Sequence, residues 1–493
     1  MMPSRGRCAA AVLAVALVVA AGCDGPYQQF LDSVPVNAIP SDVPAEVFLA
    51  IDGLSRQAFD RARARGAFAG WNTADLITAF PGTSDYAWTR TLRAGAMGGY
   101  EIQYFDPGRN VLQGAGLAGV AAHPFHEGIA GTYPCYQRFD FVGDGETWQL
   151  NSYLDPAAAL TKTLDALFDT VAARGRTQSQ IMAYVINVDV VGHEGGLDAA
   201  VAMLVEIDRR IRAFQADHER PYRFTIFADH GNAHLRSALV DPRQILRDVG
   251  VTPVESLRAG DAVAANEPGA PAVLEAVPVV HVRVNYVALH AARKDVARIA
   301  ALASRHPQID LAVAPLVTEP AGDGVVASGS ETVGGDGFAI WRDGEAFTFR
   351  RDGGGNIVVD QPDAWTWLGA DLRPWRSGDG ATATLDDRAA FAATRAGPYP
   401  DIFYRVATAF THPAARFPAD ILLSMPDDVA SYGFNVPGAA DIRAADGFHG
   451  SLSRASTMSV VASQSFALPE AVRGDDLADM FPLLRGERPR PVR

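Results

Sequence analysis

Four apolar segments of this 493-residue sequence are each followed at once by residues of a metal-binding type. The segments and their continuations are Ile51-Asp52-Gly53, Val188-Asp189-Val-Val-Gly-His193, Phe227-Ala228-Asp229-His230-Gly231 and Phe448-His449-Gly450. They supply three aspartates and three histidines, whose oxygen and imidazole donors suit zinc or a similar divalent ion. The sequence therefore predicts a metal centre formed by Asp52, Asp189, His193, Asp229, His230 and His449.

A hydroxyl-bearing segment, Phe80-Pro81-Gly82-Thr83-Ser84-Asp85, lies between a predicted strand and a predicted helix. A hydroxyl at a helix N-terminus beside a cation is favoured as an alkoxide, and the backbone N–H groups there can receive a phosphoryl oxygen. Both Thr83 and Ser84 are candidate nucleophiles on these grounds.

Each of these residues also has an ordinary structural interpretation when it is taken alone. Asp52 is suited to cap a helix that begins near Leu54, and a single buried histidine is commonly just a hydrogen-bonded core residue. It is the joint pattern, repeated after several apolar segments, that favours a metal site over these interpretations.

The elements that must position these residues alternate between strands and helices. Apolar runs predict strands over residues 46–51, 75–80, 181–188 and 222–228, and helical spacing predicts helices over 54–65, 156–174 and 197–214. This order predicts an α/β fold, with a doubly wound, mostly parallel sheet and helices on both faces. In such sheets ligands bind outside the carboxyl ends of the strands, so the candidate residues are expected to converge there.

The pattern changes after residue 236. Apolar strands and a helix between residues 278 and 314, and hairpins over 338–360, predict an inserted α+β cap over residues 236–415. Apolar strands return at 420–424 and 457–462. The predicted catalytic domain therefore comprises residues 45–235 and 416–493.

The N-terminus has the composition of an export signal. Arg5 and Arg7 precede a short apolar run over residues 9–21, which Gly22-Cys23 closes in the manner of a bacterial lipobox. We expect residues 1–22 to be a lipoprotein signal peptide and residues 23–44 a tether. The mature protein would then be exported, facing the periplasm, and anchored to the membrane by a lipid on Cys23. Cys135 has no partner for a disulfide and is interpreted as structural.

The formal net charge of −14 argues against binding of a nucleic-acid polymer over a broad surface. A small phosphate ester remains compatible with this charge, because bound metal ions reverse the local field.

The order of the motifs resembles that of the alkaline phosphatase superfamily, and most closely its nucleotide pyrophosphatase/phosphodiesterase branch. The motifs are a strand followed by Asp52, then Pro81-x-x-Ser84, Asp189-x-x-Gly-His193, Asp229-His230-Gly231 and a late His449-Gly450. The resemblance covers residues 46–236 and 415–486, and it implies an alkaline phosphatase-like fold.

The resemblance also implies roles for the residues. It implies two divalent ions, which are expected to be Zn²⁺. Asp189, His193 and His449 would hold one of them. The other would be held by Asp52, Asp229 and His230, beside Ser84 as the nucleophile, because Ser84 keeps the family's spacing from the proline. The implied activity is hydrolysis of a small phosphate ester through a phosphoseryl intermediate.

Some positions depart from the branch, and several activities stay open. Ala87 stands where many phosphodiesterases have an asparagine that holds a phosphoryl oxygen, so Arg90 is a candidate to replace it, with Thr83 as a second substrate-binding candidate. The alternatives are a phosphomonoesterase, a phosphonate or sulfate ester hydrolase, a phosphoryl-group transferase on the same fold, and a non-catalytic metal-binding lipoprotein.

Overall fold

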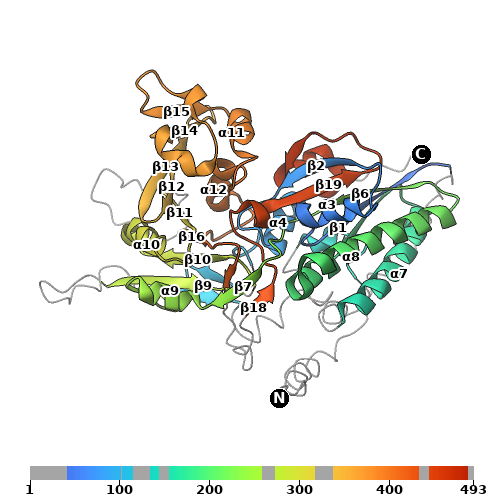
Figure 1. Ribbon diagram of the computed structural model, residues 1–493. Coiled ribbons are helices and arrows are strands. Elements are labelled where there is room, and N and C mark those ends of the chain that lie inside the picture. Colours follow the sequence, from blue (N-terminus) through green and yellow to red (C-terminus); the bar gives the residue numbers. More distant parts are fainter. Residues whose placement is uncertain are drawn as a thin grey trace, which may run out of the picture.

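The computed structural model describes residues 42–101, 103–114, 134–143, 155–257, 273–281, 283–316, 337–431 and 444–486. The predicted signal peptide and most of the tether lie outside these ranges. The described part of the chain is built around two large sheets, one of six strands and one of nine (Figure 1). No helix among the described residues is long and apolar enough to span a membrane.

The six-stranded sheet has the order β20-β2-β19-β6-β1-β5. β19 pairs antiparallel with both of its neighbours, and the other pairs are parallel. The strands are β1 (Ala45–Ile51), β2 (Asn72–Ile77), β5 (Gln180–Val185), β6 (Tyr222–Phe227), β19 (Met458–Ser463) and β20 (Ala471–Arg473). The predicted α/β fold with a mostly parallel sheet is confirmed.

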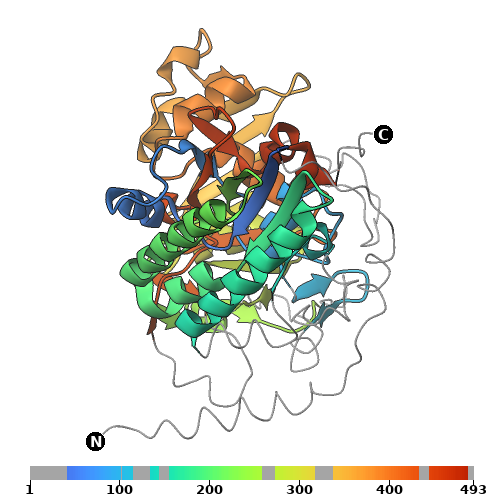
Figure 2. The same ribbon diagram turned by 90° about the vertical axis from the view of Figure 1, so that its right-hand side faces the viewer.

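Both faces of this sheet are covered, which explains why its strands are continuous apolar runs. In β1, Val47 and Leu49 pack into a core that they share with helices α3 (Arg56–Ala64), α7 (Pro156–Gly175) and α8 (Asn187–Asp217). Phe48 faces the opposite side and joins a second core, which contains Trp88 of α4 (Ser84–Thr91). Figure 2 shows α7 and α8 lying side by side across one face of the sheet.

Helix α8 begins ten residues before the helix predicted over residues 197–214, because β5 ends at Val185 and the chain turns at once into a helix at Asn187. A kink at Gly196, where φ is +65°, separates this first segment from the amphipathic part that the hydrophobic spacing reveals. The Asp189-x-x-Gly-His193 motif therefore lies on a helix and not in a loop after a strand.

The nine-stranded sheet has the order β15-β14-β13-β12-β11-β16-β10-β9-β8, and its pairs are antiparallel except for β8 with β9. Its strands are β8 (Val251–Pro253), β9 (Leu274–Val279), β10 (Tyr286–Ala291), β11 (Leu311–Pro315), β12 (Gly337–Arg342), β13 (Glu345–Arg351), β14 (Ile357–Asp360), β15 (Thr382–Leu385) and β16 (Ile421–Ser424). Helices α9 (Pro242–Asp248), α10 (Val296–Ala303), α11 (Asp387–Thr394) and α12 (Ile402–Thr411) accompany it.

Strand β16 has its partners in the nine-stranded sheet. It falls within residues 416–493, which were predicted to belong to the catalytic domain, and it pairs with β10 and β11 in the middle of that sheet. A buried apolar strand suits the middle of either sheet, so its composition does not reveal its partners. The two sheets also share one hydrophobic core, in which Phe48 and Phe338 both lie.

A smaller sheet connects two units, the first unit around the six-stranded sheet and the second unit around the nine-stranded sheet. β7 (Arg236–Val240) pairs in parallel with β17 (Val429–Ser431) and antiparallel with β18 (Ala444–Asp446). β7 follows the Asp229-His230 segment and β18 precedes His449, so this sheet brings two candidate motifs from distant parts of the sequence to one place.

A buried histidine of the second unit leads to a prediction about acid stability. His281 follows β9, stacks on Tyr286, and its Nε2 has no hydrogen-bond partner among the described residues. Burial lowers the pKa of His281 to about 3. Its ordinary pKa is about 6.5, so the unfolded chain binds the extra proton as the pH falls below about 6.5, and the folded protein loses stability down to a pH near the folded pKa.

Lowering the pH from 7.5 to 5 should therefore cost the wild type about 2 kcal/mol of unfolding free energy through His281 alone. His281→Phe keeps a stacking ring and removes this loss. Urea unfolding of both proteins at the two pH values measures the difference. Equal losses in the two proteins would show that His281 does not cause the acid sensitivity.

Candidate active site

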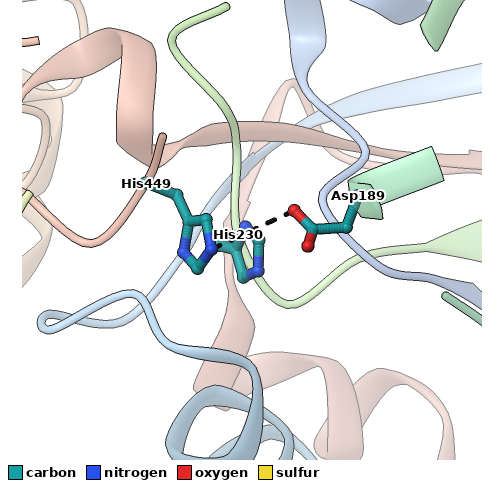
Figure 3. Close-up of side chains that lie close together, drawn as sticks. All are labelled: Asp189, His230 and His449. Carbon is teal, nitrogen blue, oxygen red and sulfur yellow. Dashed lines mark ion pairs between the residues drawn. The ribbon is translucent and has the colours of Figure 1, made fainter. Parts of the chain in front are cut away.

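The residues predicted to bind metal ions come together at one edge of the six-stranded sheet. Asp52 directly follows β1, and Asp229 and His230 follow β6. Asp189 and His193 lie in the first turns of α8. His449 arrives from the far end of the sequence, on the segment after β18. Figure 3 shows Asp189, His230 and His449 directed toward one another from these elements.

Two groups of donor atoms lie close enough to bind an ion. In the first, His230 Nε2 lies 3.1 Å from Asp52 Oδ1 and 3.4 Å from Asp229 Oδ2. In the second, Asp189, His230 and His449 offer donor atoms within 4.8 Å of one another, and His449 Nε2 lies 4.0 Å from Asp189 Oδ1 (Figure 3). His230 belongs to both groups, and all of these residues are buried.

The position of His193 differs in one respect from the predicted arrangement. Its Nε2 lies 3.2 Å from Asp189 Oδ2, but its ring centre is 5.3 Å from that of His449. The ring of His230 is stacked on His449 at 3.6 Å, so His230 completes the tighter group with Asp189 and His449. His193 lies beside this group, bound to Asp189.

The three histidines are oriented in the same way. Nδ1 of His193 lies 2.7 Å from Gly447 O, Nδ1 of His230 lies 2.8 Å from Gly231 O, and Nδ1 of His449 lies 2.7 Å from Gly82 O. Because a carbonyl only accepts, each Nδ1 carries the proton and donates it. In a neutral imidazole this leaves the Nε2 lone pair available as a ligand on the side of the carboxylates.

The charges of the cluster fit a bound cation. Asp189 Oδ1 and Asp229 Oδ2 are fully buried and accept no hydrogen bond within the described part of the chain. Burial and the nearby Asp52 carboxylate raise the pKa of Asp229 well above its ordinary value. Burial opposes protonation of His230, but the Asp229 and Asp52 carboxylates outweigh it and raise the pKa of His230 to about 10. Buried carboxylates this close together need positive charge nearby, and divalent ions would supply it.

Ser84 lies against this cluster. It is the first residue of α4, and its Oγ is 3.2 Å from Asp52 Oδ1 and 3.2 Å from His230 Nε2. The side chain that caps α3 is Ser55, whose Oγ accepts from Ala58 N at 3.1 Å. Asp52 therefore does not cap this helix, and its carboxylate faces Ser84 and His230.

The two predicted substrate-binding residues do not join Ser84. Thr83 Oγ1 donates to Tyr100 O at 2.7 Å. Arg90 is 2% exposed and forms an ion pair with Asp475. Six residues of helix turn the chain by about 240°, so Arg90 lies on a different side of α4 from Ser84. The structure therefore places the Arg90 guanidinium with Asp475 and not beside the Ser84 hydroxyl.

Tyr184, which was not among the predicted site residues, holds Asp52 in place. Its hydroxyl donates to Asp52 Oδ2, and both residues are buried. Burial and the Asp52 charge raise the pKa of Tyr184 well above its ordinary value, so the phenol remains protonated as a donor. Tyr184 lies inside the apolar strand β5, where a tyrosine is indistinguishable from a core residue, so no signal in the sequence could have identified it.

The fold and site define a class of protein, an α/β protein with a buried cluster of aspartates and histidines that can bind metal ions beside a serine. The model of the type I phosphodiesterase / nucleotide pyrophosphatase family matches residues 59–320, more than half of the chain. The matched region includes Ser84, Asp189, His193, Asp229 and His230. The chain belongs to this family, and it is a hydrolase that acts on phosphoric ester bonds.

Similar solved structures include human ectonucleotide pyrophosphatase/phosphodiesterase 5, with 10% identity and a TM-score of 0.43 over 91% of this chain and 96% of that one. The murine protein has 9% identity and a TM-score of 0.44, with coverage of 91% and 97%. An inactive variant of the murine protein in complex with AMP has 10% identity and a TM-score of 0.43, with coverage of 91% of this chain and 97% of that one. Comparison with curated proteins gives no match.

Proposed function

We propose that this protein is an exported, metal-dependent phosphodiesterase that acts through a phosphoseryl intermediate at a two-metal site. The observation that carries the proposal is the position of the Ser84 hydroxyl. It lies at a helix start and within 3.2 Å of both Asp52 and His230, in a cluster with buried carboxylate oxygens that accept no hydrogen bond from the described residues.

Asp52, Asp229 and His230 would hold one ion, and Asp189, His193 and His449 the other. When bound, the two ions would neutralise phosphate charge and lower the pKa values of the serine hydroxyl and of water. His230 lies between the two sets and within reach of both. The ion expected from the donor types is Zn²⁺.

The chain's own groups define the course of the reaction. Ser84 gives up its hydroxyl proton to solvent, its Oγ forms a bond to phosphorus and the bond from phosphorus to the leaving alkoxide breaks. The alkoxide takes a proton from water, and the phosphoryl group stays on Ser84 with its second ester bond. Water then attacks phosphorus, the bond from phosphorus to Ser84 breaks, and Ser84 regains a proton as the monoester leaves. The Thr83 hydroxyl donates a hydrogen bond to Tyr100 O and does not cap α4. The backbone N–H groups at the N-terminus of α4 can therefore donate hydrogen bonds to a phosphoryl oxygen.

Two chromogenic substrates test the proposal. The zinc-loaded protein should hydrolyse bis-p-nitrophenyl phosphate faster than p-nitrophenyl phosphate, as measured by kcat/KM. The reverse preference would favour a phosphomonoesterase. No turnover of either substrate by fully metal-loaded protein would contradict the hydrolase proposal and favour the phosphoryl-group transferase or the non-catalytic lipoprotein.

The membrane anchor belongs to the same proposal and rests on the sequence of residues 1–23, which lie outside the described part of the chain. Cys23→Ser should move the protein from the membrane fraction to the soluble periplasmic fraction. An unchanged distribution between the two fractions would rule out a lipid on Cys23.

A further inference from the structure

Arg405 of helix α12 is buried, with 2% of its surface exposed, and its guanidinium is held by backbone carbonyls. Nε donates to Thr78 O at 2.9 Å, and one terminal nitrogen donates to Leu452 O at 3.0 Å. The other terminal nitrogen donates to Ser451 O at 3.2 Å and reaches Ala79 O at 3.5 Å. The guanidinium therefore bridges two segments that are far apart in the sequence.

Each of these segments carries a residue of the candidate active site. Thr78 and Ala79 follow β2 and lead directly into the loop that ends at Ser84. Ser451 and Leu452 come immediately after His449-Gly450. The guanidinium lies at the junction of the nucleophile segment (residues 78–84) and the histidine segment (residues 449–452).

The two segments also contact each other closer to the site. His449 Nδ1 donates to Gly82 O at 2.7 Å, and Gly82 N donates to Gly450 O at 3.4 Å. The ring of Phe80 lies under the guanidinium, with its centre 5.9 Å from Cζ of Arg405. The hydrogen bonds of Arg405 therefore add to existing contacts between the nucleophile segment and the histidine segment, and they fix these two segments together farther from Ser84.

The other buried arginines of this region are bound differently. Arg90 pairs with Asp475, and Arg473 pairs with Asp401 and Asp387. Arg405 alone among these three forms hydrogen bonds to backbone carbonyls of both segments within the described part of the chain. Burial lowers the pKa of Arg405 to about 9, so it still carries its charge at neutral pH. A planar fork of donors suits several carbonyls at once, whereas the single ammonium of lysine does not.

We propose that Arg405 is a positioning residue, which fixes the nucleophile segment against the histidine segment and so sets the placement of Ser84 relative to His449. This inference rests on the proposed roles of Ser84 and His449. The second unit thus supplies, through α12, a part of the site's framework.

Arg405→Met and Arg405→Ala test this in the full-length, zinc-loaded protein. Misplacement of reacting groups by about 1 Å costs roughly 100-fold in rate, so kcat for bis-p-nitrophenyl phosphate should fall by about 100-fold in Arg405→Met. KM should change by less than about threefold, because Arg405 is not expected to touch substrate. Arg405→Ala should regain part of its kcat when free guanidinium is added at a non-denaturing concentration.

Arg473→Met is the control, since it removes a second buried arginine from the same region, 8% exposed against 2% for Arg405, but leaves the hydrogen bonds of Arg405 to both segments intact. Circular dichroism should show a retained fold in both variants. If Arg473→Met loses as much kcat as Arg405→Met, or if guanidinium fails to rescue Arg405→Ala, the positioning role is wrong and Arg405 serves only the fold.

Metal binding separates this inference from the proposed function. Loss of a supporting contact near a metal ligand typically weakens metal affinity by about 10-fold or more, so Arg405→Met should bind its more weakly held zinc ion at least tenfold less tightly than Arg473→Met does. If the wild type hydrolyses no phosphate ester, the proposed function fails, and this comparison of zinc affinities still decides the role of Arg405. Equal affinities in the two variants would overturn it.

Discussion

Replacement of Ser84 by alanine is expected to lower kcat for bis-p-nitrophenyl phosphate by about 10⁴-fold or more, because it removes the hydroxyl on which the proposed covalent intermediate forms. The hydroxyl contacts Asp52 and His230 at 3.2 Å, but it is not itself a predicted metal ligand. Zinc content measured by mass spectrometry should therefore stay at the wild-type value. Steady-state kinetics of the metal-loaded variant gives the rate.

Thr83 provides the matched control for this experiment. Thr83→Ala removes the hydrogen bond to Tyr100 O and should lower the unfolding free energy by about 1 kcal/mol, with a much smaller effect on kcat. If Ser84→Ala retains turnover and Thr83→Ala abolishes it, Thr83 is the nucleophile and our assignment of Ser84 is wrong.

His230→Ala is expected to have the second large effect, because His230 lies in both donor groups. Its removal takes one ligand from the group with Asp52 and Asp229, and it leaves these buried carboxylates with one positive partner fewer. Zinc content should fall by at least one ion per chain, and kcat should fall by about 10³-fold. Equilibrium dialysis against zinc, followed by kinetics at saturating metal, measures both.

His218 is a matched control for His230. Its Nδ1 also bonds to a backbone carbonyl, Phe214 O at 2.8 Å, but it lies at the end of α8, away from the cluster. His218→Ala should keep the full zinc content and kcat. Retention of both ions and of activity in His230→Ala would exclude His230 as a ligand.

Much of the site could be predicted because its residues follow buried strands. Asp52, Asp229 and His230 come directly after β1 and β6, and neighbouring parallel strands bring their carboxyl ends together. His449 does not follow a strand of the main sheet. It was found only because its motif keeps the family's order, and the small sheet around β7 is what brings it to the site.

The features of the fold and site that could not be predicted depend on tertiary contacts, which leave no local pattern in the sequence. β16 reads as a buried strand, but its partners are set by the nine-stranded sheet. Tyr184 holds Asp52 by a hydrogen bond and Arg405 bonds to several backbone carbonyls, but each has the appearance of an ordinary residue in its own strand or helix. Arg90 shows the opposite case, because its charge and its nearness to Ser84 in the sequence suggested a role in substrate binding, while the structure pairs it with Asp475.

Hydrolysis by this protein is expected to require bound divalent ions, and a zinc titration of the chelator-treated protein tests this requirement most directly. We expect the metal-free protein to have no measurable turnover of bis-p-nitrophenyl phosphate and activity to return in proportion to added zinc until two ions are bound per chain. Full turnover by protein shown to contain no divalent ion, or failure to bind zinc, manganese or another divalent ion at any concentration, would contradict it.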